Sequence, residues 1–79
     1  MRKSNRAEKE GTVEIVGRNI VLYNDAEAYP IALSGCSYEL RIEEWVAHLS
    51  AKPWAAPHMV REFERLARAY HGLPPASGA

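Results

Sequence analysis

The side chains that most often carry chemistry are sparse in this 79-residue chain. Its single cysteine is Cys36, and its three histidines are His48, His58 and His71. No pair among them has the short spacing of two to five residues that is typical of zinc ligands. The five glycines are dispersed instead of forming a phosphate-binding loop. We therefore expect no catalytic residue, no metal site and no cofactor.

Each of these four residues has a structural interpretation. Cys36 precedes a predicted helix, where a thiol pKa can fall, but a small filler of a turn or of the core is the favoured role. His71 falls at a predicted helix C-terminus, where an imidazole can cap the helix dipole. His48 and His58 are interpreted as surface or structural side chains.

The charges, which sum to zero, are unevenly distributed along the chain. Residues 1–10 carry +2, residues 11–50 carry −4, and residues 51–79 carry +2. Such asymmetry bears on the choice of partner and not on the fold.

The acidic middle segment predicts one candidate binding surface. Its carboxylates come from a loop and from a predicted helix, and a leucine lies among the helical ones: Asp25, Glu27, Glu39, Leu40, Glu43 and Glu44. An apolar side chain ringed by carboxylates is suited to a basic partner. An ordinary solvated helix face is the alternative.

The basic segments predict a rival surface. At about 100° per residue, Arg61, Arg65 and Arg68 align on the side of a predicted helix opposite its apolar stripe. With the N-terminal Arg2, Lys3, Arg6 and Lys9 they could contact phosphates. The alternative is a solvated face whose arginines pair with neighbours, as Glu62–Arg65 and Glu64–Arg68.

Three short strands are expected before the helices. Residues 12–23 form a hairpin if Gly17-Arg18 is its two-residue turn, with Gly17 in a positive-φ conformation. Ile15 then faces Ile20 and Val13 faces Leu22, so all four side chains share one face. The strand expected at 29–33 contains Pro30, which favours a place at the sheet edge.

Two amphipathic helices follow. Ser37 is the predicted N-cap of the first, whose apolar stripe comprises Tyr38, Ile42, Trp45, Val46 and Leu49. Pro57 fits the first turn of the second, whose stripe comprises Met59, Val60, Phe63, Leu66, Ala67 and Tyr70. Gly72 before Leu73-Pro74 predicts its end.

The expected fold is α+β: a three-stranded antiparallel sheet covered on one face by a two-helix hairpin, βββαα. We expect a charged arm at 1–10, one domain at 11–73 and a loose tail at 74–79. Trp45 is expected in the core, and Trp54 either covers the core or is an exposed anchor. The open sheet edge, or the uncovered sheet face with Val16, Val21 and Tyr23, offers a surface for homo-oligomerisation.

Residues 29–73 resemble small proteins encoded by phages, plasmids and prophages. The shared pattern is a strand ending near Cys36, a helix with Ile42 and Trp45, a connection with Lys52 and Trp54, and a second amphipathic helix. No activity is agreed for those proteins. As a class, small phage-encoded domains of this kind are similar to anti-CRISPR inhibitors, which dock on a defence complex and block its DNA-binding surface, often through acidic residues.

The leading functional hypothesis is thus a non-enzymatic inhibitor that binds a protein or ribonucleoprotein complex of a host defence system. A small nucleic-acid-binding accessory protein and a homo-oligomerising structural element are the alternatives. The lone cysteine and the absence of a 20-residue apolar run favour a cytoplasmic protein without a membrane span. A monomer or weak homodimer is expected.

Overall fold

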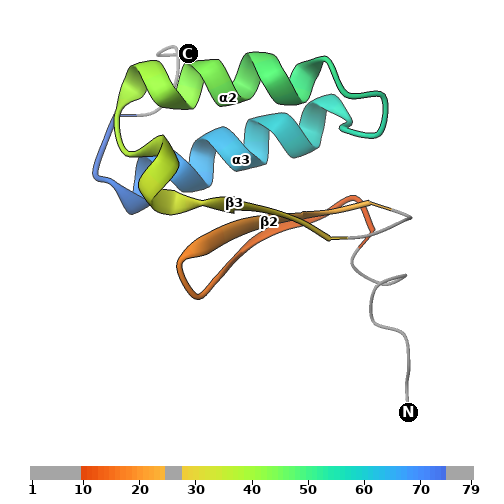
Figure 1. The fold of residues 1–79 in the computed structure, drawn as a ribbon, viewed down its shortest axis with the longest axis horizontal. Coiled ribbons are helices and arrows are strands. Elements are labelled where there is room, and N and C mark those ends of the chain that lie inside the picture. The colour runs from red at the N-terminus through yellow and green to blue at the C-terminus, as the bar shows by residue number, and fades with distance from the viewer. Residues whose placement is uncertain (1–9, 25–27, 75–79) are drawn as a thin grey trace.

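A computed structural model describes residues 10–24 and 28–74, which form a sheet layer and a helix layer (Figure 1). The element order is β1 (Val13–Val16), β2 (Asn19–Tyr23), β3 (Ala28–Ala32), a 3-10 helix η1 (Leu33–Cys36), α2 (Glu39–Ser50) and α3 (Pro57–Tyr70). The sheet is antiparallel in the order β1-β2-β3, and helices pack on one of its faces. The predicted α+β, βββαα architecture is confirmed.

The first hairpin has the predicted register. Ile15 pairs with Ile20, and Val13 pairs with Leu22. Gly17 has φ 61°, the positive value that its turn requires. The pairing with β2 extends to the residues that precede β1, since the Gly11 N–H donates to the Tyr23 carbonyl at 2.8 Å.

The third strand lies at the sheet edge, as Pro30 predicts. It spans Ala28–Ala32, one residue earlier than expected, because Leu33 already begins η1. The uncovered sheet face is less open than predicted, since Val21 is only 7% exposed. Val21 lies on the central strand between Glu14 of β1 and Pro30 of β3, where flanking residues shield it.

The N-cap predicted for the helix that the structure places at Glu39–Ser50, α2, is wrong. Ser37 adopts helical angles (φ −89°, ψ −5°) because it closes η1. Tyr38 is the extended residue before α2, and it makes no side-chain capping bond. Tyr38 is also exposed, so the buried stripe of α2 begins at Ile42 and not at Tyr38.

Helix α3 begins at Pro57, as predicted, and ends in a Schellman motif. Gly72 has φ 72°. The Leu73 N–H donates to the Arg68 carbonyl at 2.7 Å, and the Gly72 N–H donates to the Ala69 carbonyl at 3.2 Å. Leu73 then packs against the core.

The core lies between the two layers, where α3 contacts β1 and β2 while α2 packs beside α3 and η1. Its buried members are Ile20, Leu22, Ile31, Leu33, Cys36, Ile42, Leu49, Met59, Val60, Phe63 and Ala67. Trp45 and Trp54 pack against this cluster from its rim and are half-buried. No helix within residues 10–24 and 28–74 is long and apolar enough to span a membrane.

Candidate functional site

The outward face of α2 carries part of the predicted acidic surface. Ile42 and Leu49 are fully buried, so residues on the other side of the helix face away from the core. Leu40 is 58% exposed there, and Glu43 and Glu44 are exposed beside it. We call these three residues the α2 outer patch.

Glu39 is exposed as well, but it is left out of this patch because it contacts α3. Its carboxylate lies 3.5 Å from the guanidinium of Arg68 on α3, so Glu39 contributes to the junction between the helices. Glu44 also has a partner, Arg41, at 3.4 Å, but both side chains remain more than half exposed. The other two predicted members, Asp25 and Glu27, lie outside the described residues.

The predicted basic surface is wrong in one of its three helical members. Arg68 is only 5% exposed. It donates to Glu64 at 3.2 Å, to Glu39 at 3.5 Å and to the Pro74 carbonyl at 3.1 Å. The polar side of α3 covers a wide arc of the helix. Arg68 lies at one margin of this arc, where it faces α2 instead of solvent. Arg68 therefore joins both helices to the segment after α3.

The remaining arginines of α3 are exposed. Arg65 is paired with Glu62, with 2.9 Å between Nε and Oε1, and this hydrogen bond lowers the pKa of Glu62. Arg61 is exposed as well. Both intrahelical pairs that were the alternative for this surface, Glu62–Arg65 and Glu64–Arg68, are present. The arm residues Arg2, Lys3, Arg6 and Lys9 lie outside the described residues.

Two of the histidines connect distant segments. The His58 Nε2 lies 2.8 Å from the Gly11 carbonyl, and the His71 Nε2 lies 2.9 Å from the Leu33 carbonyl. In each case Nε2 must carry a proton to donate. His71 is the C-cap residue of α3, at the helix C-terminus where it was predicted, and its imidazole ties this end of α3 to η1. His48 is exposed on α2.

Cys36 is fully buried, as a core filler should be. Its thiol lies 3.5 Å from the Leu33 carbonyl and 3.6 Å from the Ala32 carbonyl. Burial raises the thiol pKa, which disfavours the nucleophilic thiolate. Within the described part of the chain, no three His, Cys, Asp or Glu side chains come together in a way that could hold a metal ion.

A hollow beside the α2 outer patch was not predicted. Arg41, Glu44, Trp45 and His48 line a volume of about 280 Å³ on the flank of α2. The rings of Trp45 and His48 pack edge to face, with 5.4 Å between ring centres. The helical spacing of these four residues was visible in the sequence, but Trp45 was assigned wholly to the core. It is a core residue with part of its surface in this hollow.

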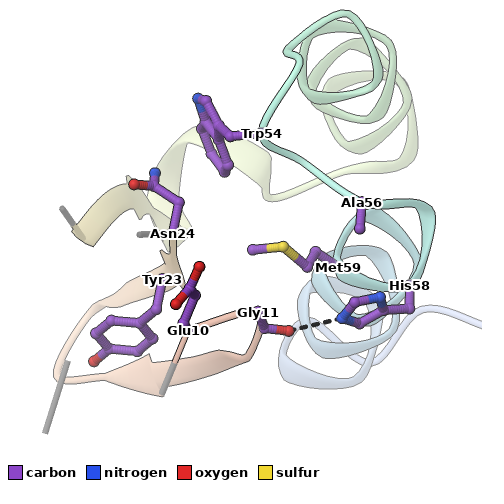
Figure 2. Close-up of a pocket in the computed structure, with 8 residues that line it drawn as sticks. All are labelled: Glu10, Gly11, Tyr23, Asn24, Trp54, Ala56, His58 and Met59. Carbon is purple, nitrogen blue, oxygen red and sulfur yellow. Dashed lines mark hydrogen bonds between the residues drawn. The ribbon is translucent and has the colours of Figure 1, made fainter. Parts of the chain in front are cut away.

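A second unpredicted recess, of about 250 Å³, lies at the end of the sheet near Trp54 (Figure 2). Figure 2 shows Glu10 and Asn24 on its sheet side and Trp54 and Met59 on its helix side. Trp54 packs on Tyr29 with 5.2 Å between ring centres, which supports its role as a cover for the core. Asn24 is buried and already engaged in interactions of its own. We therefore interpret this recess as part of the packing that covers one end of the core.

No protein-family model, no curated protein and no solved structure matches this chain. Function must therefore be argued from the surfaces themselves.

Proposed function

We propose that this chain is a non-enzymatic binding protein that docks the outward face of α2 on a basic surface of a protein or ribonucleoprotein complex. One observation carries the proposal. Leu40 is exposed one helical turn from the exposed Glu43 and Glu44, on a helix whose opposite side is fixed in the core.

The apolar centre of the patch supports a docking role. A single exposed leucine is ordinary, but Leu40 lies on the same helix as the hollow formed by Arg41, Glu44, Trp45 and His48. Tryptophan and arginine are the residue types most often found at energetic centres of interfaces. Because α2 is already folded and packed, docking through it orders little additional chain.

The charge of the patch favours a basic partner. Glu43 and Glu44 are exposed, and Glu44 has only a solvated ion pair with Arg41. Such carboxylates accelerate encounter with a positive surface and oppose docking on a negative one. On α3, Arg68 is buried against carboxylates of the same chain, and Arg65 is paired with Glu62, which weakens the case for a phosphate-binding surface there.

For the partner, we propose a CRISPR effector complex. The resemblance of residues 29–73 to small phage and plasmid proteins, and of that class to anti-CRISPR inhibitors, supports this choice. Effector complexes hold nucleic acid in a positively charged channel. A rigid acidic helix bound at that channel would compete with target DNA. Homo-oligomerisation is less favoured, because Val21 of its proposed surface is buried.

The test measures binding of target DNA to purified guide-loaded effector complexes by gel shift, with increasing amounts of this chain. The unsubstituted chain should reduce DNA binding. The double variant Glu43→Lys/Glu44→Lys should lose most of that inhibition, because two charges are reversed and the docking face changes by +4. Arg61→Glu, which changes the exposed charge of α3, should inhibit as the unsubstituted chain does.

Two results would count against the proposal in distinguishable ways. Unchanged DNA binding for every effector tested would remove the CRISPR effector as the partner. Inhibition that is retained by the double variant and lost by Arg61→Glu would move the docking face from α2 to α3.

A further inference from the structure

Three segments meet at the end of the two-layer fold that lies opposite the recess of Figure 2. They are the β1–β2 turn, η1 and the C-terminus of α3, which lie together at one end of the molecule in Figure 1. The Leu33 N–H donates to the Arg18 carbonyl at 2.9 Å, and the Leu33 carbonyl accepts from His71 at 2.9 Å. These two hydrogen bonds hold the three segments in fixed relative positions.

The segments surround a pocket of about 490 Å³, a volume in the range of small-molecule sites. Its lining combines polar and apolar groups, including Arg18, Asn19, Leu33, Ser34, Tyr70 and His71. Because the lining residues come from three elements already tied together, the pocket is preformed.

The charge of this pocket favours an anion. Arg18 contributes a permanent positive charge, and no carboxylate is found among the described residues that line it. Arg18 is exposed at the turn, so its guanidinium is accessible to a ligand. Ser34 and Asn19 add a hydroxyl and an amide that can donate to the same anion.

The aromatic side of the pocket favours a flat ring. Tyr70 is 53% exposed, although it occupies an apolar position in the stripe of α3. Its ring packs at 85° on His71, whose own ring is held by the Leu33 carbonyl. Tyr70 is thus supported from one side and available for stacking, the arrangement that proteins use to hold a nucleobase.

The geometry points to a binding site for a nucleotide unit, with its phosphate at Arg18 and Ser34 and its base on Tyr70. The unit is a free nucleotide or one residue of a single strand, since both present the same phosphate and ring. This site uses none of the residues of the α2 outer patch, so it stands or falls separately from the docking function.

The experiment follows backbone amide shifts of the ¹⁵N-labelled chain as adenosine monophosphate, inorganic phosphate or a single-stranded adenine hexanucleotide is added. Adenosine monophosphate should shift Arg18, Asn19, Ser34 and His71, and should bind more tightly than phosphate. Arg18→Gln should weaken its binding about tenfold, because a charge-assisted contact is lost. Tyr70→Leu should weaken it several-fold. A matched control, Arg61→Gln, removes an exposed arginine of α3 and should leave binding unchanged.

The hexanucleotide separates the two sources. Tighter binding than the mononucleotide, with a steep salt dependence, assigns the site to a strand, and equal binding assigns it to free nucleotides. Absence of localised shifts with all three ligands would overturn the site. Equal weakening by Arg18→Gln and Arg61→Gln would also overturn it, because binding would then reflect net charge alone.

Discussion

The outward faces of α2 and α3 use similar residues for different purposes. Both helices bury one side in the same core and carry charged side chains on the other. On α3, Arg65 and Arg68 are paired with carboxylates of the chain. On α2, Leu40, Glu43 and Glu44 remain exposed. The difference lies in burial: Arg68 is buried among its partners and is lost from the surface, whereas Arg65 and Glu44 remain exposed although each has a partner.

The two faces are coupled at one point. Glu39 from the predicted acidic surface and Arg68 from the predicted basic surface bind each other. The helix–helix junction therefore takes one residue from each candidate surface, which leaves the α2 outer patch smaller and more apolar than the acidic surface expected from the sequence.

The largest expected effect comes from Arg68. Arg68→Ala removes a buried guanidinium that donates hydrogen bonds to two carboxylates and a backbone carbonyl. It should lower the free energy of unfolding by about 2–3 kcal/mol. Urea denaturation measures this value. Arg65→Ala breaks a solvated pair on the same helix and should have a much smaller effect. Similar losses for the two variants would show that the burial of Arg68 does not make it more important to stability than the exposed Arg65.

A smaller effect is expected at the end of α3, where the Arg68 carbonyl is capped by Leu73. Gly72→Ala places a Cβ at φ 72° and should cost about 1 kcal/mol of unfolding free energy. Gly35→Ala is the matched control, because its added Cβ meets no atom within 4 Å and its φ is not positive. A larger loss at Gly35 would contradict the assignment of Gly72 as the helix terminator.

Much of the fold could be predicted because its signals are local. Gly17 set the hairpin turn and hence the pairing of Ile15 with Ile20, and Gly72 set the end of α3. The sequence predicts Ser37 as the N-cap of α2, but Ser37 closes the 3-10 helix η1. A 3-10 helix has no strong sequence signal, so this prediction was wrong.

The candidate site was harder to predict, because its decisive contacts join distant residues. The periodicity of α3 shows which side is apolar, but not that α2 lies against the Arg68 edge. Similarly, the contact of His71 with Leu33 spans 38 positions, and the pocket at Arg18 depends on three separate segments. Spacing within one element carries no information about such contacts.

The smallest expected effect is a pH dependence on α3. Hydrogen bonding from Arg65 lowers the pKa of Glu62 in the folded chain. The stabilisation from this pair is therefore fully present above the ordinary glutamate pKa of about 4.3 and is lost as the pH falls through the lower folded value. An NMR titration of the Glu62 side chain measures this pKa. In Arg65→Ala it should return toward its ordinary value, and an unchanged value would assign the shift to another cause.

The central claim is that α2, and not α3, presents the docking face. Its most direct test is the concentration of chain needed for half-maximal inhibition of DNA binding by the effector, measured for two matched pairs of variants. Glu43→Gln and Leu40→Ala alter the α2 outer patch, whereas Glu62→Gln and Val16→Ala change a half-exposed carboxylate of α3 and an exposed apolar side chain of β1. The account predicts at least about a fivefold increase for each member of the first pair, equivalent to roughly 1 kcal/mol, and little change for the second. Equal increases for the two pairs would contradict it.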